Sequence, residues 1–392
     1  MADDNTPQST GNSGSGNSGN PPAPASSLRV RVLHPLSPNQ PFRPLPPPTG
    51  KPPYHFSLNT VVSDAQIAAI NAAGRLVFHI GGDTGGVKAP QAQQIVAMHM
   101  ESDLAASSGA EQPAFFYHLG DVVYYYGEAA NYYSQFYEPY MQYPLPILPI
   151  PGNHDGDVLD ASVPSLAAFV ENFCATDPHL TPEAGDATRM ALTLPNVYWT
   201  LEAPFVTIIG LYTNVPEGGR LDNDQIAWFA SELSGAPADK ALIVAMHHPI
   251  YSADIYHSGS AYMAGILDQA IQQTGRVPDI VFAGHVHNYQ RFTRAFNGRD
   301  IPYIVAGASG YWHLHYMQKV NGQLPQVPYA VPGMDATLES YCEDRHGFMR
   351  LEVTADTLKG TYFAVPRPQE SWRGPSTTID SFTLDLKQHK LL

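Results

Sequence analysis

From Ser63 onward, apolar and polar positions along the chain follow the periods of regular structure. Ser63 can cap a helix that runs to about Ala73, and the apolar run 76–80 after it predicts a strand. Further helices are predicted at 91–106, 128–140, 166–173, 224–233 and 262–272. Strands are predicted between them at 114–118, 146–150, 205–211, 241–245 and 280–283, and in the tail at 303–306, 347–353, 357–364 and 382–386. Sheets from both halves of the chain, packed together with helices outside, would form a four-layer αββα sandwich of the α/β (α+β) class.

The chain ahead of Ser63 has a different composition. Residues 1–27 are mostly Ser, Gly, Asn and Pro, so we expect a disordered low-complexity leader that cannot bury enough surface to offset its ordering entropy. Residues 28–62 form a lead, with an alternating strand at 28–33 and an extended, proline-dense stretch at 35–53. That stretch is either a stiff cover or a ligand for a proline-reading domain. Residues 63–392 are then one catalytic domain.

Composition limits the class of protein. With 392 residues and 43% hydrophobic content, the chain can bury a large core. No run approaches the ~20 apolar residues that cross a bilayer, so we expect no membrane association. The formal net charge of −15 argues against nucleic acid as a partner, while the sequence leaves protein partners open. The N-terminus has neither the basic nor the apolar part of a secretory signal, which favours the cytoplasm. Cys174 and Cys342 are expected to be buried free thiols.

Five short segments each place an oxygen or imidazole ligand after a short apolar run. They are Gly82-Asp83-Thr84-Gly85, Gly120-Asp121-Val122-Val123-Tyr124, Gly152-Asn153-His154-Asp155, Met246-His247-His248-Pro249 and Gly284-His285-Val286-His287. Because the motifs follow strands and precede helices, their ligands should meet at one edge of a sheet. Alone, Asp83 would be an ordinary residue of a strand-exit turn. In this order the segments predict a two-metal phosphoesterase.

The ligand types indicate the metals. The Asp121 carboxylate can bridge two cations, and a Tyr124 phenolate is a hard anionic donor that favours a trivalent ion such as iron. Asn153 offers a neutral amide oxygen, with His154 beside it. His285 and His287, two residues apart, can face one centre from an extended segment.

Four other histidines are expected to be structural. His313 and His315 repeat the spacing of two, but they lie in an aromatic, loop-like region, and we expect them to line the pocket or pack. His79 and His118 fall within predicted strands and are expected to be satisfied core histidines.

With these motifs the chain resembles the calcineurin-like metallophosphoesterase superfamily and, within it, the purple acid phosphatases. The broader superfamily usually has a His two residues after the first Asp, where this chain has Gly85, and Tyr124 follows the second Asp at the purple-phosphatase spacing. The segment from Gly284 to Arg291 also resembles that family, and the resemblance covers about 76–309. Two departures are the short region ahead of it, where many members carry a fibronectin-like domain, and the lack of the export signal typical of members.

The resemblance implies a complete set of site residues. Asp83, Tyr124 and His287 would hold Fe(III), Asn153, His247 and His285 would hold Fe, Zn or Mn, and Asp121 would bridge the two ions. His154 would contact the phosphate and stabilise the transition state. His257 would be the general acid, although Tyr256 stands where some members have a second histidine.

The sequence therefore predicts an acid phosphatase that hydrolyses phosphate monoesters of small molecules with a metal-bound hydroxide. One alternative is a phosphodiesterase on the same metal core, decided by the loops at 156–195 and 308–332. Another is a non-catalytic phosphate-binding or adaptor protein that uses its proline-rich lead.

Overall fold

The computed structural model describes residues 44–158, 162–214 and 219–392. The predicted leader at 1–27 and the predicted strand at 28–33 lie outside these residues. Within the described ranges, no helix is long and apolar enough to span a membrane.

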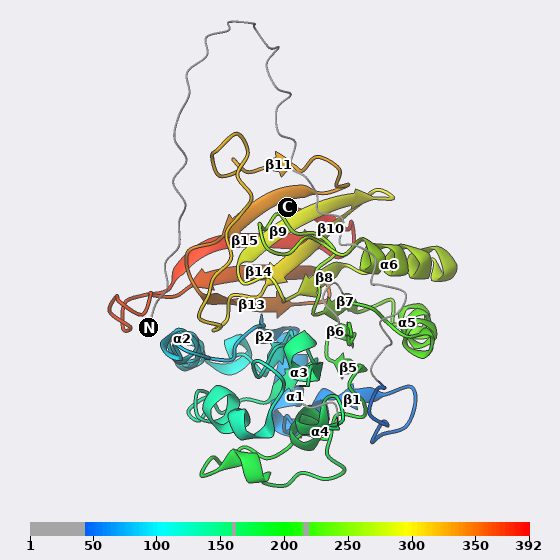
Figure 1. Ribbon diagram of the computed structural model, residues 1–392. Helices are drawn as coiled ribbons and strands as arrows, with labels where there is room; N and C mark the ends of the chain where they lie inside the picture. Colours follow the sequence, from blue (N-terminus) through cyan, green and yellow to red (C-terminus); the bar gives the residue numbers. More distant parts are fainter. Residues whose placement is uncertain (1–43, 159–161, 215–218) are drawn as a thin grey trace, which may run out of the picture.

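Two sheets form the interior of the molecule (Figure 1). The nine-stranded sheet contains, in spatial order, β1 (His55–Ser57), β5 (Trp199–Ala203), β6 (Val206–Gly210), β7 (Ala241–Met246), β8 (Ile280–Ala283), β10 (Arg299–Ala306), β9 (Tyr289–Phe296), β12 (Thr337–Cys342) and β11 (Tyr329–Ala330). The seven-stranded sheet contains β16 (Lys390–Leu391), β15 (Thr377–Asp385), β14 (Thr357–Ala364), β13 (Gly347–Val353), β2 (Leu76–Gly81), β3 (Phe116–His118) and β4 (Ile147–Pro149). Strands β6, β7, β8 and β10 are mutually parallel, as are β2, β3 and β4.

Helices lie on both sides of the paired sheets. α5 (Asn223–Gly235) and α6 (Ala261–Thr274) pack together beside β6, β7 and β8. On the other side, α2 (Gln91–Ala106) lies near β13, with α1 (Asp64–Ala73) close by (Figure 1). The shorter α3 (Asn153–Gly156) and α4 (Ala167–Phe173) complete the helices. This arrangement confirms the predicted αββα sandwich.

Neighbouring residues on the central strands belong to different cores. Ile208 and Ile243 point into the core that also contains Phe78 of β2, whereas Ile209 and Val244 belong to the core beneath α5 and α6. Because side chains alternate along a strand, β6 and β7 are buried on both faces, which explains their unbroken apolar sequence. Both cysteines are buried and unpaired, as predicted.

The predicted first helix is confirmed in its bounds and its cap. The Ser63 side chain accepts a hydrogen bond from the Gln66 backbone N–H, and Gly74 ends α1 in the left-handed conformation with φ of 66°.

The predicted helix at 128–140 is wrong as a single α-helix. The structure has a 3-10 turn at Ala129–Asn131 and a π-helical turn at Tyr133–Tyr137. In an α-helix the N–H of residue 139 would bond to the carbonyl of Gln135, but Pro139 has no N–H. That carbonyl instead accepts from Gln93 Nε2 at 2.6 Å.

One buried ion pair joins the two sheets. Arg291 on β9 donates two hydrogen bonds to Asp380 on β15, at 2.6 and 3.1 Å. The Tyr289 hydroxyl donates to the same carboxylate at 2.7 Å. The side chains of Arg291 and Asp380 are only 13% and 8% exposed. Water could therefore solvate neither charge well if its partner were removed.

We expect Asp380→Ala to lower the free energy of unfolding by about 3 kcal/mol, since it leaves the Arg291 guanidinium without a counter-ion. The matched control is Asp356→Ala, which removes an ion pair with Lys387 whose side chains are 62% and 72% exposed. That variant should lose much less stability than Asp380→Ala, because solvent screens the exposed pair. Chemical denaturation measures both, and equal losses would show that the pair between the sheets adds no more than a surface pair.

Candidate metal centre

Five strand ends meet at one edge of the paired sheets. Asp83, Asp121 and Asn153 follow β2, β3 and β4 of one sheet, and His247 and His285 follow β7 and β8 of the other. The strands within each set are parallel, so their carboxyl ends lie at the same edge. The structure thus brings together ligand candidates that are some two hundred positions apart in the sequence.

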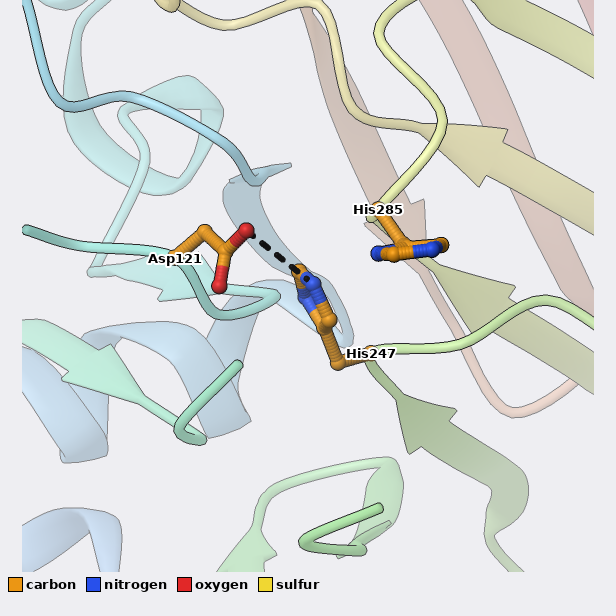
Figure 2. A group of neighbouring side chains, drawn as sticks. All are labelled: Asp121, His247 and His285. Atoms are coloured by element: carbon orange, nitrogen blue, oxygen red, sulfur yellow. Dashed lines mark ion pairs between the residues drawn. The ribbon is translucent and has the colours of Figure 1, made fainter. Parts of the chain in front are cut away.

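One group of donors surrounds His247. Ligand atoms of Asp121, His247 and His285 all lie within 4.8 Å of one another, and Figure 2 shows His247 between the other two. Asn153 Oδ1 is 3.1 Å from His247 Nε2 and 3.0 Å from His285 Nδ1. His247 Nδ1 donates to the Leu119 carbonyl at 2.8 Å, which turns Nε2 toward the carboxylate of Asp121.

A second group lies around Tyr124. Its hydroxyl is 3.3 Å from both Asp83 Oδ1 and His287 Nε2, and those two atoms are 3.4 Å apart. His287 Nδ1 donates to the His313 carbonyl at 3.1 Å. Each group therefore has an imidazole fixed by a backbone carbonyl, with its other nitrogen facing the remaining donors.

The carboxylate of Asp121 lies with these donors and is incompletely satisfied. Oδ1 accepts from the His154 backbone N–H at 2.9 Å. Oδ2 is buried and forms an ion pair with His247 Nε2 at 3.3 Å, but among the described residues it accepts no hydrogen bond of good geometry. An unsatisfied buried carboxylate oxygen is costly, and a cation would satisfy it. Carboxylate, phenol, amide and imidazole groups are ligands of iron, zinc and manganese, so these residues fit metal ions.

Protonation states show how strongly the site needs positive charge. Burial, together with the nearby Asp121 carboxylate, raises the pKa of Asp83 to about 8. Burial alone would also raise the pKa of Asp121, but the imidazoles of His247 and His154 hold it well below its usual value. Burial opposes the charge of His247, yet Asp121 raises the pKa of that imidazole to about 9. Burial lowers the pKa of His287 to about 3, so this imidazole is neutral, as a metal ligand must be.

Three ligand candidates have unusual backbone conformations. Asp83, Asp121 and His285 have φ of 59°, 55° and 68°, in the left-handed region that side chains other than glycine seldom adopt. Such strain occurs where a site needs a particular direction for a side chain.

Gly85 has no room for a side chain. A Cβ there would lie 2.7 Å from Tyr124 Cδ2 and would also overlap Gln135 Oε1. The Tyr124 ring therefore fills the space that a side chain at 85 would need. Gln135 fixes the Tyr124 backbone, because its Oε1 accepts from the Tyr124 N–H at 2.9 Å and its Nε2 donates to the Tyr124 carbonyl at 2.9 Å.

Both predicted catalytic histidines lie beside the donor groups and are partly exposed. His154 Nδ1 donates to the Tyr125 carbonyl at 2.9 Å, and its ring centre is 4.4 Å from that of Tyr124. The His257 ring centre is 4.5 Å from that of His285. The structure therefore brings all nine predicted site residues together.

The four histidines expected to be structural all contact neighbouring side chains. His313 is partly buried, with its ring centre 5.1 Å from that of Trp312. His315 is buried against His287 with 4.2 Å between ring centres, and its Nδ1 accepts from the His287 backbone N–H at 3.3 Å. His79 contacts the Tyr143 hydroxyl and the Asp103 carboxylate at 2.8 and 2.9 Å, and His118 contacts the Thr84 hydroxyl at 2.9 Å.

The sequence analysis missed the part played by Asp155. Its carboxylate accepts from the backbone N–H groups of Gly152, Val122 and Val123 at 2.8, 3.0 and 3.1 Å. It thereby joins the loop that carries Asp121 to the loop that carries Asn153. Its place in the Gly-Asn-His-Asp segment was the available signal.

Comparison with known proteins agrees with this geometry. The family model of the calcineurin-like phosphoesterases matches residues 79–289, more than half of the chain. The chain belongs to this family. The matched region contains all seven metal-ligand candidates and both predicted catalytic histidines.

Within the family, the curated relatives include purple acid phosphatases. Purple acid phosphatase 21 of Arabidopsis thaliana is 30% identical over 152 residues, which are 36% of this chain and 34% of that protein. Fe(3+)-Zn(2+) purple acid phosphatase 12 of the same plant is 37% identical over 78 residues, 19% of this chain and 16% of that protein. The matched stretches span at most about a third of the length of these relatives.

Solved structures share the fold. Purple acid phosphatase PPD1 from yellow lupin (Lupinus luteus) seeds matches with a TM-score of 0.57 at 17% identity, over 79% of this chain and 54% of that one. GAP50, the anchor in the inner membrane complex of Plasmodium, matches with a TM-score of 0.51 at 16% identity, over 78% of this chain and 89% of that one.

The pKa values predict that metal binding releases protons. At pH 7, before a cation binds, Asp83 with a pKa of about 8 and His247 with a pKa of about 9 both hold a proton. Each must lose it to coordinate an ion, so affinity should rise with pH and proton release should fall as pH passes 8 and then 9. Calorimetric zinc titrations in buffers of different ionisation enthalpy measure this release. Binding without release at pH 7 would contradict the proposed ligands.

Proposed function

We propose that the protein is a binuclear metal phosphoesterase of the purple acid phosphatase type, which hydrolyses phosphate monoesters of small molecules. The observation that carries this proposal is the group formed by Asp83, Tyr124 and His287, with a phenol hydroxyl 3.3 Å from both a carboxylate oxygen and an imidazole nitrogen. The names of the curated relatives support the same activity.

For the metals we infer Fe(III) at Asp83, Tyr124 and His287. A second ion, Fe, Zn or Mn, would be held by Asn153, His247 and His285. The hard phenolate and carboxylate favour the trivalent ion, while amide and imidazole suit a divalent one. Asp121 would bridge the two ions, which agrees with its buried Oδ2 that accepts no hydrogen bond of good geometry among the described residues. The name of purple acid phosphatase 12, with Fe(3+) and Zn(2+), supports this pair.

The partly exposed His154 and His257 have distinct roles in the proposed reaction. Two bound ions supply a Lewis acid for the phosphate oxygens and lower the pKa of a bound water. With Nδ1 donating to the Tyr125 carbonyl, His154 keeps Nε2 for the phosphate, where it neutralises charge that develops on the oxygens. His257 would give a proton to the leaving alkoxide, a contribution of roughly 10²–10⁴-fold.

A second candidate is a non-catalytic role, because GAP50 shares the fold and is described as an anchor. The complete set of donors at the metal centre favours an enzyme.

Hydrolysis of a phosphodiester in preference to a monoester would instead support the phosphodiesterase alternative on the same core.

We expect Asp121→Ala to bind well below two metal equivalents and to lose hydrolysis, because the two ions would no longer share a ligand. Elemental analysis of the purified protein and rates on a phosphomonoester and a phosphodiester give both readouts. The control Asp186→Ala removes an exposed carboxylate that bonds to Tyr133 and should change neither. Two full equivalents of metal in Asp121→Ala would overturn the binuclear site.

Tyr124→Phe tests the trivalent ion. A phenolate bound to Fe(III) absorbs visible light by charge transfer, so protein produced with iron should be pink to purple and this variant should lose the colour and the trivalent iron. Tyr117→Phe is the control, because Tyr117 is buried in β3 and its hydroxyl has no hydrogen-bond partner among the described residues. A colourless, active, iron-free wild type would replace the iron assignment with a divalent pair and leave the phosphoesterase intact.

A further inference from the structure

The residues of the candidate metal centre differ in their exposure. Asp83, Asp121, Tyr124 and His247 are at most 1% exposed, whereas Asn153, His154 and His257 are partly exposed. In the proposed reaction a phosphate ester would therefore approach past the partly exposed His154 and His257, with its organic group on the side of these two residues.

Aromatic rings continue from His154 along this side. Tyr125 accepts the His154 hydrogen bond through its carbonyl, and its hydroxyl accepts from the Tyr311 hydroxyl at 3.2 Å. The Tyr311 ring centre lies 4.3 Å from that of Tyr124 and 4.4 Å from that of His287. The Tyr125–Tyr311 pair thus begins at the metal centre itself.

The rings then lead to His257. Trp312 is 6.2 Å from Tyr311 and 5.1 Å from His313, and His313 is 5.8 Å from Tyr256, measured between ring centres. Tyr256 directly precedes His257. We name Tyr125, Tyr256, Tyr311 and Trp312 the aromatic rim, which runs from one predicted catalytic histidine to the other.

Two members of the rim face solvent. Trp312 is 37% exposed and Tyr256 is 45% exposed. Large aromatic side chains that stay exposed at the mouth of a polar site provide flat apolar surface for a ligand. Lys88 lies over Trp312, with Nζ 4.9 Å from the ring centre, and it forms no ion pair with a carboxylate in the described ranges. The rim therefore combines ring surface with a positive charge that suits a phosphorylated compound.

We propose that the aromatic rim is the leaving-group subsite and selects phosphate esters whose alcohol carries an aromatic ring. This inference rests on the proposed phosphoesterase function and adds the class of substrate. The ring of the ester would stack on Trp312, the rim residue beside Tyr311, while the phosphate occupies the metal centre. An aromatic pair contributes about 0.5–1.5 kcal/mol beyond its area, which is a preference of about 2- to 12-fold.

Benzyl phosphate and cyclohexylmethyl phosphate test the rim in protein loaded with iron and zinc. Both are esters of primary alcohols with similar shape, and only the first has an aromatic ring. We expect the wild type to prefer benzyl phosphate in kcat/KM by about 2- to 12-fold. The preference should fall to about one in Trp312→Ala, and also in Trp312→Leu, which keeps apolar bulk without an aromatic face.

Tyr316→Ala is the matched control, since Tyr316 is a 51% exposed tyrosine in the same loop and, within the described part of the chain, its ring does not contact the rings of the rim. It should keep the wild-type preference. Equal rates on both esters in the wild type, or an unchanged preference in both Trp312 variants, would overturn the inference and leave the phosphoesterase standing. No hydrolysis of either ester would overturn the proposed function, and the subsite with it.

Discussion

Two carboxylates share one buried site, and much of the local structure compensates for their charge. Asp83 and Asp121 are both almost inaccessible to water, where two negative charges cannot coexist without donors or cations. The backbone supplies part of the compensation: the N–H of His285 donates to both oxygens of Asp83, and the N–H of His154 donates to Asp121. The left-handed φ of three ligand residues is consistent with the same constraint, since it directs side chains and N–H groups to one point.

The paired sheets make this arrangement rigid. Donors from β2, β3 and β4 lie opposite donors from β7 and β8, so the site depends on how the two sheets dock. Gly284 permits a close approach there, because a Cβ at that position would lie 2.6 Å from Asp83 Oδ2. Elsewhere, Arg291 and Asp380 join the sheets through a buried ion pair. Hydrogen bonds among the residues of the centre and the docking of the two sheets therefore both keep the donor atoms in position.

The positions of the candidate ligands could be predicted from the sequence because each lies in a short segment that follows an apolar run, and that local pattern survives folding. The bounds of α2 could also be predicted, because the helical pattern of its segment is likewise local. Strand β9 was missed because its polar residues are accommodated by distant partners: Gln290 accepts from the Ala253 N–H, and Arg294 pairs with Asp268. The alternation of apolar and polar residues along the strand does not indicate such long-range contacts. The role of Asp155 was hidden similarly, since it requires two loops about thirty residues apart in the sequence to meet.

Packing links the choice of ligand at the metal centre to the surface that a substrate meets. The space beside Asp83 can hold a side chain at position 85 or the ring at position 124, and this chain places the ring there. That ring then packs against Tyr311, which also covers His287 and reaches Tyr125 through its hydroxyl. A side chain at 85 would overlap Gln135 Oε1 and the Tyr124 ring, which is the surface on which Tyr311 rests. The tyrosine that we infer to be an iron ligand is thus also the base of the aromatic rim, so the proposed metal preference and the proposed substrate preference would depend on one packing arrangement.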